Sequence, residues 1–346
     1  MEYRKKIGWW LMLGVVMLMI QVVLGGITRL TGSGLSITEW KPIMGFIPPL
    51  NQDEWVVAFE KYKTATGQYK FLNADFTLAD FKFIFFWEWF HRNWARFIGV
   101  AFLIPFIWFL YKRAFSADMI PKLIGLFVLG IGQGLIGWIM VQSGLTDDNL
   151  YVSHIRLAIH FISALILIAF TFWFALNLLV PPIERFQDKG MKRVLWVFIA
   201  LLAIQLCYGA FMAGLKAATV AATWPDINGE LIPASLYSLN IFSHPVAIHF
   251  LHRTLAYLLL GLMLFLTYRS TRTGTQSALW KIIRWVPLAL VVLQIVLGIG
   301  SVLWSVHAER NGFGLFEWAA QGHQIVAMLL GMSVLYMVFL CSRKVA

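Results

Sequence analysis

The sequence predicts an all-α integral membrane protein whose eight transmembrane helices form two pseudo-symmetric four-helix bundles, arranged as a parallel repeat. Of its 346 residues, 60% are hydrophobic and only 13% are charged. With a mean hydropathy of +0.73, the chain holds more apolar surface than a soluble fold of this length can bury. The other two observations are eight long apolar stretches and a set of histidines and glutamines that recurs along them.

Each apolar stretch is long enough to cross the hydrocarbon core, which takes about 20 helical residues. The stretches run over about 7–28, 83–111, 120–142, 154–180, 193–215, 246–268, 281–306 and 318–341. Because the number of crossings is even, both termini are predicted on the same side of the membrane. The start lacks a cleavable secretory signal and an organelle transit peptide, so a multi-pass protein of a bacterial plasma membrane is predicted.

The basic residues predict the orientation of the spans. A net charge of +11 could suggest a nucleic-acid partner, but the basic residues gather at alternate span ends, so no such partner is expected. By the positive-inside rule these ends, and both termini, are cytoplasmic. The basic residues are Arg4, Lys5, Lys6, Lys112, Arg113, Lys122, Arg185, Lys189, Lys192, Arg193, Arg269, Arg272, Lys281, Arg284, Arg343 and Lys344. The opposite segments hold acids: Glu39, Asp53, Glu54, Asp75, Asp147, Asp148, Asp226 and Glu309.

A glutamine followed four residues later by a glycine recurs in the odd-numbered spans. The pairs are Gln21 and Gly25, Gln133 and Gly137, Gln205 and Gly209, and Gln294 and Gly298. Residues four apart lie on one face of a helix. There the glycine allows a neighbouring helix to approach and the amide can bond across the interface, so helix packing explains the pattern. Direct contact between the glutamine and a ligand stays the alternative.

Four histidines recur in the even-numbered spans, each near the start of its span. The interval from His91 to Gln133 equals that from His252 to Gln294, at 42 residues, and His160 and His323 occupy matching places. Four crossings separate equivalent helices, so both halves run in the same direction. The sequence therefore predicts an N-terminal bundle over residues 1–182 and a C-terminal bundle over residues 183–346.

The two halves differ in one loop and in one side chain. The outer loop over 29–82 is much longer than its counterpart over about 216–245. Three residues before His91 stands Glu88, whereas His249 stands three residues before His252. Unequal loops over similar bundles predict different roles for the two halves.

Paired histidines inside a membrane indicate a cofactor site. An ionisable residue in a span is costly and is a functional candidate, and four at matching positions strengthen that case. Two neutral imidazoles from facing helices suit a heme iron, whereas zinc normally takes more ligands. All four histidines lie within about three turns, or roughly 15 Å, of the outer face, so both sites are expected side by side there. A relay of hemes stacked across the bilayer would need a second histidine about 13 residues further along each helix, which the sequence lacks.

Charged residues beside the histidines are candidates for chemistry. Glu88 and His91 share a helix face, so Glu88 is predicted to accept a proton or to position the substrate. The alternatives are that it orients an imidazole or pairs with Arg92 or Arg96. Arg92 and Arg253 are candidates for binding heme propionates, with extension to the membrane interface as the alternative.

The other histidines and the cysteines are expected to be structural or solvated. His154, His244 and His307 have no partners in the repeat, and His249 is of interest because it occupies the position of Glu88. The two cysteines, at 207 and 341, are far apart in apolar spans, so neither a disulfide nor a cysteine metal site is predicted.

Several motifs in combination resemble the heme A synthase family. They are Thr28-Arg-Leu-Thr-Gly-Ser-Gly-Leu-Ser36, Glu88-Trp-Phe-His91-Arg92, Gly209-Ala-Phe-Met-Ala-Gly214-Leu215, Trp224-Pro225 and His249-Phe-Leu-His252-Arg253. The resemblance runs through nearly all eight spans and is closest to the branch shared by Gram-negative bacteria and mitochondria. That branch lacks the cysteine pair that other members carry in the first outer loop, and this chain has no cysteine there.

The resemblance implies an oxidation, in which the C8 methyl of heme O becomes a formyl group by successive hydroxylations to give heme A for terminal oxidases. It implies a resident heme b on His252 and His323, and heme O between His91 and His160 with Glu88 at its reactive edge. The implied partners are heme O, membrane lipid, heme O synthase and an electron-transfer partner, and a homo-oligomer stays open. A lipid-facing cleft is expected to admit the farnesyl tail of heme O.

Two other functions stay open from the residues alone. One is a bis-histidine b-type membrane cytochrome for electron transfer, which would tolerate Glu88→Ala. The other is a heme carrier, which would leave the heme chemically unchanged.

Overall fold

The computed structural model describes residues 2–39, 41, 44–146, 149–234, 236, 240–309 and 312–342. Within these residues the secondary structure is helical, apart from two isolated β-bridges. Eight helical segments are long and apolar enough to cross a membrane, which confirms the predicted fold class. They are α1 (Glu2–Leu30), α4 (Leu78–Tyr111), α5 (Met119–Gln142), α6 (His154–Leu179), α7 (Lys189–Gly214), α8 (Pro245–Thr271), the pair α9 (Ala278–Ile283) and α10 (Val286–Leu303), and α11 (Leu315–Leu340).

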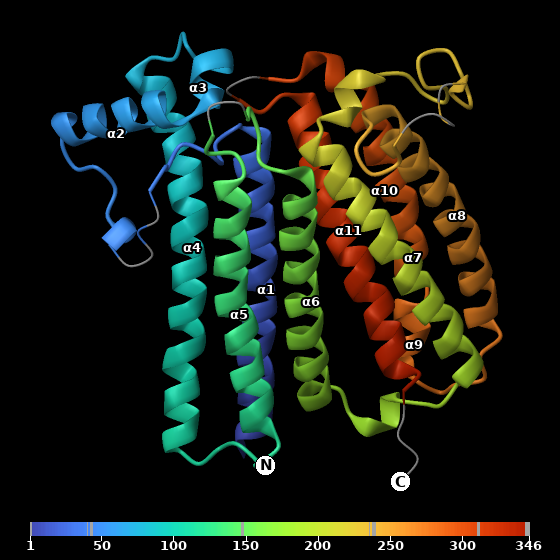
Figure 1. The fold of residues 1–346 in the computed structure, drawn as a ribbon. Helices are drawn as coiled ribbons and strands as arrows, with labels where there is room; N and C mark the ends of the chain where they lie inside the picture. Colours follow the sequence, from blue (N-terminus) through green and yellow to red (C-terminus); the bar gives the residue numbers. More distant parts are fainter. Residues whose placement is uncertain are drawn as a thin grey trace.

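The long helices stand side by side in two groups (Figure 1). In one group α1 packs against α4 and α6, and α5 packs against the same two helices. In the other, α7 and α10 each pack against α8 and α11. The groups meet where α6 contacts α7 and α11, and where α1 contacts α11. The predicted bounds of the two halves and their origin as an internal repeat stay predictions.

The seventh span differs from the single stretch predicted over 281–306. It is divided into α9 and α10, with Arg284 and Trp285 between them. Pro287 is the second residue of α10. A proline lacks the N–H that would bond to the preceding turn, yet it is well tolerated in the first turn of a new helix. The chain therefore breaks its helix just before this proline.

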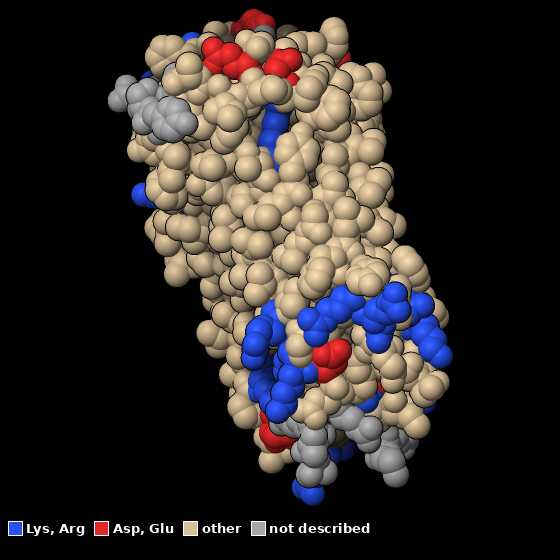
Figure 2. Space-filling view, turned by 90° about the vertical axis from the view of Figure 1, so that its right-hand side faces the viewer, with Lys and Arg blue, Asp and Glu red and all other residues tan. Residues whose placement is uncertain are grey.

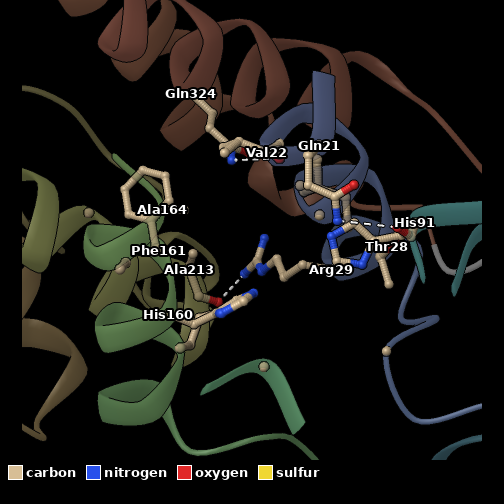
Figure 3. Close-up of a pocket in the computed structure, with 18 of the residues that line it drawn as sticks. Gln21, Val22, Thr28, Arg29, His91, His160, Phe161, Ala164, Ala213 and Gln324 are labelled. Atoms are coloured by element: carbon tan, nitrogen blue, oxygen red, sulfur yellow. Dashed lines mark hydrogen bonds between the residues drawn. The ribbon is translucent and has the colours of Figure 1, made fainter. Parts of the chain in front are cut away.

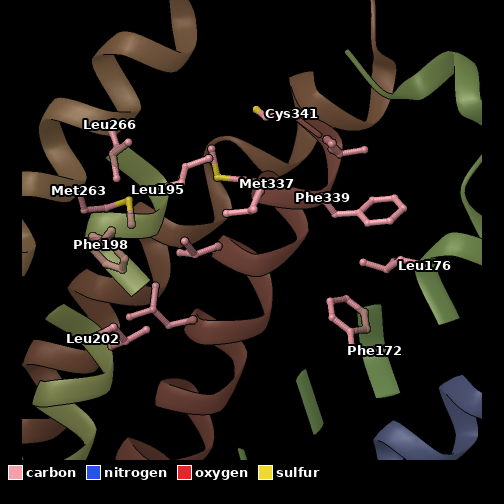
Figure 4. Packing of buried hydrophobic residues seen from close by; sticks show 14 of the residues in the cluster. Phe172, Leu176, Leu195, Phe198, Leu202, Met263, Leu266, Met337, Phe339 and Cys341 are labelled. Atoms are coloured by element: carbon pink, nitrogen blue, oxygen red, sulfur yellow. The ribbon is translucent and has the colours of Figure 1, made fainter. Parts of the chain in front are cut away.

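The main apolar core lies among α6, α7, α8 and α11, and α11 is the most enclosed of the spans. Figure 4 shows Phe172 and Leu176 near Phe339, with Leu195, Phe198, Leu202, Met263, Leu266 and Met337 in the same cluster. Lipid is as apolar as these side chains, so their close packing stabilises the bundle mainly through dispersion. Cys341 is buried in this core and Cys207 is half-buried, and both are free thiols.

Charge is divided between the two ends of the bundle. α1 begins and α11 ends at the same end (Figure 1). On the face shown in Figure 2, most Lys and Arg side chains gather at that end, and a broad uncharged belt separates them from acidic side chains at the other. Arg343, Lys344, Asp147 and Asp148, four of the residues used to predict orientation, lie outside the described residues. The described charges follow the predicted pattern.

The long loop between α1 and α4 folds into a cap on the end opposite the basic residues. It contains η1 (Met44–Phe46), α2 (Gln52–Ala65) and α3 (Gly67–Leu72), with Asn51 and Thr66 as N-caps of the two α-helices. An aromatic cluster fixes α2 to the first turns of α4. Its buried members are Phe59, Tyr62, Phe76, Phe81 and Phe85, together with Ile84.

The contact between α7 and α6 gives a test of the packing. A Cβ on Gly214 would lie 2.6 Å from His154 Cβ and 2.8 Å from its Cα, whereas a Cβ on Gly261 of α8 would have no atom within 4 Å. Gly214→Ala should therefore lower the free energy of unfolding by about 1–3 kcal/mol, because the helices must separate. Gly261→Ala should be neutral or stabilising by about 1 kcal/mol, since alanine is the better helix former. Thermal unfolding of both variants in one detergent measures this difference, and equal melting temperatures would contradict it.

Candidate heme-binding site

A continuous cavity of about 1450 Å³ lies between the two groups of helices. All four of the recurring histidines line it, and each comes from a different helix: His91 from α4, His160 from α6, His252 from α8 and His323 from α11. The structure thus brings the predicted histidines to one shared space. Their role as metal ligands stays a prediction.

His252 and His323 face each other across the second half of the cavity. Their ring centroids are 6.2 Å apart and the ring planes are inclined by 65°. Two imidazoles on opposite sides of one metal ion would stand about 6 Å apart, given metal–nitrogen bonds of about 2 Å and about 1 Å from each nitrogen to its ring centre. His323 Nδ1 donates to the carbonyl of Gln294 at 2.9 Å, which leaves Nε2 available to a metal.

His91 and His160 form the corresponding pair in the first half. Figure 3 shows both imidazoles pointing into the pocket from different helices, with the guanidinium of Arg29 seen between them. The amide of Gln21 donates to the backbone carbonyl of His91 at 3.2 Å. Gln205 makes the same bond to the carbonyl of His252, at 3.1 Å. The first and third motif glutamines therefore have one structural role, which supports the packing interpretation of the motif.

Each glycine of the recurring motif lies against the imidazole of a neighbouring helix. In the first half, a Cβ added to Gly25 would lie 3.3 Å from His91 Nε2, and one added to Gly137 would lie 3.0 Å from His160 Cε1. In the second half, a Cβ added to Gly209 would lie 3.3 Å from His252 Cε1, and one added to Gly298 would lie 3.0 Å from His323 Cε1. These distances are shorter than an ordinary side-chain contact, so only glycine at these positions leaves enough space for the imidazole rings. The motif glycines approach histidine rings, which the sequence did not indicate.

The four motif glutamines also carry buried side-chain oxygens without a hydrogen-bond partner within the described part of the chain. These are the Oε1 atoms of Gln21, Gln133, Gln205 and Gln294. A buried acceptor without a partner is costly. These oxygens are closed off from the cavity, so they do not by themselves indicate a ligand in it. Direct contact between these glutamines and a ligand stays a prediction.

The donor set suits a metal that arrives inside a macrocycle. The described residues contain no group of three or more His, Cys, Asp or Glu side chains placed to hold a metal ion. A heme iron already has four porphyrin nitrogens and needs only two axial ligands. Two imidazoles per half, with a glycine beside each ring, fit such a group.

Glu88 is buried, with 2% of its surface exposed, and it fastens the start of the long outer loop. One carboxylate oxygen accepts from Ser36 Oγ at 2.7 Å and from the Ile37 N–H at 2.9 Å. The other forms an ion pair with Arg92 at 2.6 Å. The ion pair with Arg92 was one of the alternatives expected for Glu88, and the structure contains it. Glu88 also lines the cavity.

The matching position in the second half repeats this arrangement with an imidazole. His249, 1% exposed, accepts from Arg253 Nε at 3.0 Å. Arg253 donates to the carbonyls of Thr223 and Asp226, both at 2.7 Å. In the first half, Arg92 donates to the carbonyls of Ile37 and Glu39 at 3.1 and 3.3 Å. We call these two sets of bonds from an arginine to loop carbonyls the arginine bridges.

The arginine bridges bear on the predicted binding of propionates. Both guanidinium groups line the cavity, but the partners seen here are loop carbonyls. The sequence could not indicate them, because a backbone carbonyl has no residue signature. Binding of propionates by Arg92 and Arg253 stays a prediction.

Two acidic residues in the loops at the capped end, Glu39 and Asp226, are held in their ionised form. Hydrogen bonds from Lys41 and Lys61 lower the pKa of Glu39 below its usual value. Hydrogen bonds from Thr223 and the Gly229 N–H do the same to the pKa of Asp226. The stabilisation from both is present near neutral pH and is lost as the pH falls through these lowered values.

Comparison with known proteins identifies the family. Residues 8–335 match the family described as cytochrome oxidase assembly protein. The chain belongs to this family. Relatives named heme A synthase are similar over most of both chains. That of Rhodospirillum centenum is 41% identical over 90% of this chain and 84% of its own length. That of Flavobacterium johnsoniae is 39% identical over 96% and 97%, and that of a Bradyrhizobium species 41% identical over 86% and 83%.

One cavity residue of this family member has a role that sequence reasoning missed. Arg29 appeared only within the motif after the first span, yet its guanidinium donates to the carbonyl of Ala213, on α7 of the other half (Figure 3). The signal in the sequence was a positive charge at the end of an apolar span. Arg29 thus joins the two halves inside the cavity.

The remaining histidines lie outside the pairs. The ring of His154 bonds the carbonyl of Phe242 at 2.9 Å, His244 precedes α8, and His307 lies in the short helix η5 (Ser305–His307). None of these three lines the cavity, whereas His249 does.

Removing the Glu88 carboxylate should loosen the outer loop. Glu88→Ala removes the carboxylate that accepts from Ser36 Oγ and the Ile37 N–H and that pairs with Arg92, which keeps its bonds to loop carbonyls. The loss should cost about 3 kcal/mol of unfolding free energy. Limited proteolysis should then cut the segment 36–50 faster, and thermal unfolding should begin earlier. The matched control is His249→Ala, which should loosen only the loop after α7. Unchanged proteolysis of 36–50 in Glu88→Ala would contradict this role.

Proposed function

We propose that this protein is a heme A synthase, which oxidises the C8 methyl group of heme O to a formyl group by successive hydroxylations and so supplies heme A to terminal oxidases. The observation that carries the proposal is the single cavity in which both histidine pairs meet. Relatives named heme A synthase that match along nearly the whole chain support it. A membrane enzyme of this kind needs room for a resident heme and a substrate heme, and the two halves offer one place each.

The second half is proposed to hold the resident heme, of the b type, on His252 and His323. The 6.2 Å between their ring centroids supports this assignment. A heme with two imidazole ligands supplies a one-electron carrier beside the substrate. The chain contributes the orientation of the ligands, because Gln205 fixes the helix that carries His252 and the carbonyl of Gln294 fixes the His323 ring.

The first half is proposed to bind heme O between His91 and His160. Glu88 lies on the same face of α4 as His91, three residues before it, and is proposed to act at the reactive edge of the substrate as proton acceptor or positioning group. Its bonds to Ser36, Ile37 and Arg92 hold the carboxylate in one place. Arg92 and Arg253 are proposed to release loop carbonyls in favour of propionates when heme is present.

The orientation proposed is that of a bacterial plasma-membrane protein with both termini in the cytoplasm. The gathering of Lys and Arg at the end where α1 begins and α11 ends supports it. The capped end, with the heme sites near it, then faces outward. A heme O synthase would deliver the substrate, and an electron-transfer partner would exchange electrons with the resident heme.

Expression of the chain in a host that makes heme O but not heme A tests the reaction. The expected result is heme A among the extracted pigments, identified by mass. Glu88→Gln should accumulate heme O or its hydroxylated intermediate, because the amide keeps the shape of the side chain but cannot accept a proton. Extracted heme that is unchanged by the wild-type protein would instead indicate a carrier or an electron-transfer cytochrome. Full heme A production by Glu88→Gln would remove its proposed role.

Ligand substitutions separate the resident site from the substrate site. His252→Ala and His323→Ala should each lose most of the heme that copurifies with the protein, because one axial bond is removed. His91→Ala should retain that heme and lose heme A formation. Visible absorption of the purified proteins, with pigment extraction, measures both. Equal loss of resident heme in all three variants would overturn the division of roles between the halves.

A further inference from the structure

The cavity reaches deeper into the membrane in the first half than in the second. On α1 the cavity lining extends 11 residues from Gln21, to Trp10. On the matching helix α7 it extends only 3 residues from Gln205, to Leu202. On each of the other three matched pairs of helices it extends four residues further in the first half. In the first half the lining ends at Phe102 of α4, Leu126 of α5 and Thr171 of α6. In the second half it ends on the matching helices, at Leu259 of α8, Val291 of α10 and Leu330 of α11. Four helical residues correspond to about 6 Å, so the first half has an additional arm.

The additional arm is apolar. Its lining includes Trp10, Leu11, Phe102 and Phe127. The two polar groups there are already bonded within the protein, since the indole N–H of Trp10 donates to the Ala101 carbonyl and the Thr171 hydroxyl donates to the Leu167 carbonyl. An arm that offers no free donor or acceptor from these groups suits a hydrocarbon rather than water.

Glycines make the space for the arm. Gly130 and Gly134 of α5 and Gly99 of α4 line the cavity, and a Cβ on any of them would have no atom within 4 Å. At the matching positions, counted from the same glutamine and histidine, the second half has Val291, Ile295 and Leu260. Val291 is buried in the main core, with Ile295 and Leu260 packed against that core. The second half therefore carries large apolar side chains where the first half has glycine.

We propose that this arm binds the long isoprenoid tail of the substrate heme and that its absence from the second half suits a heme without such a tail. The inference rests on the proposed function and adds to it the subsite that distinguishes the substrate from the resident group. Gly130 lies seven residues, or about 10 Å, deeper in α5 than Gly137, which contacts the His160 ring. The arm thus begins beyond the level at which the iron would be held.

The arm is expected to distinguish hemes by the shape of the tail it can hold, and not by the free energy of moving that tail from lipid into protein. An isoprenoid chain gains little when it leaves lipid for another apolar environment. A side chain that fills the arm would instead clash with the tail, and overpacking of this kind is destabilising. Substitutions in the arm should therefore act on hemes that carry the tail and spare hemes that lack it.

The test compares heme O with heme B, which lacks the tail, on protein purified with its resident heme. Added heme is titrated and followed by absorbance, so that the titration reports the first half. Gly130→Leu on α5 and Gly99→Leu on α4 should each weaken binding of heme O about tenfold and leave binding of heme B within about twofold. Gly132→Leu is the matched control, because Gly132 lies on the same helix with open space around it but outside the cavity lining.

The outcomes are separable. If Gly130→Leu and Gly99→Leu weaken heme O and heme B equally, or weaken neither, the arm does not hold the tail and the inference is overturned. An equal effect from Gly132→Leu would also overturn it. If the unsubstituted protein takes up neither heme, the proposed function itself fails. Thermal unfolding of each variant confirms that the comparison is made on folded protein.

Discussion

The close approach of four glycines to four imidazoles is the contact on which the interior of this protein depends. Each histidine ring has its place because the facing helix carries no Cβ there. The glutamine one turn before the glycine then fixes the register of the two helices in two of the four cases, by bonding the backbone of the histidine. A buried imidazole without such a place would force the helices apart, since protein interiors are close-packed. The cavity and its histidines are consequences of the same short motif.

The two halves use this arrangement differently. In each half an arginine, Arg92 or Arg253, follows the recurring histidine and donates to the carbonyls of a loop. One turn before each arginine stands Glu88 in the first half and His249 in the second. The first half has a carboxylate at this place, a folded cap and a deeper cavity, whereas the second has an imidazole and a filled core. Arg29 joins them, reaching from α1 to the carbonyl of Ala213. The carboxylate, the folded cap and the deeper cavity all belong to the half to which we assign the substrate.

Much of the fold could be predicted from the sequence, because the apolar stretches and the basic residues at alternate ends are local signals. The recurrence of histidines indicated which helices would line a site, and the shared cavity agrees. The break before Pro287 was missed, although proline gave a local signal for it. The ion pair between Glu88 and Arg92 was among the expected alternatives. The bonds from Arg29, Arg92 and Arg253 to backbone carbonyls could not be predicted, since the positions of those carbonyls depend on how the loops and halves pack. The depth of the cavity likewise depends on which glycines face inward, which spacing alone does not settle.

The arginine bridges have a consequence for how the outer segments can change over time. The guanidinium groups recognise main-chain oxygens, which every amino acid provides, so the tethered residues are free to be replaced without loss of attachment. Insertions beyond the tether point are equally tolerated, as the difference in length between the two loops illustrates. A lineage can therefore remodel the surface of these loops while the cavity beneath keeps its form.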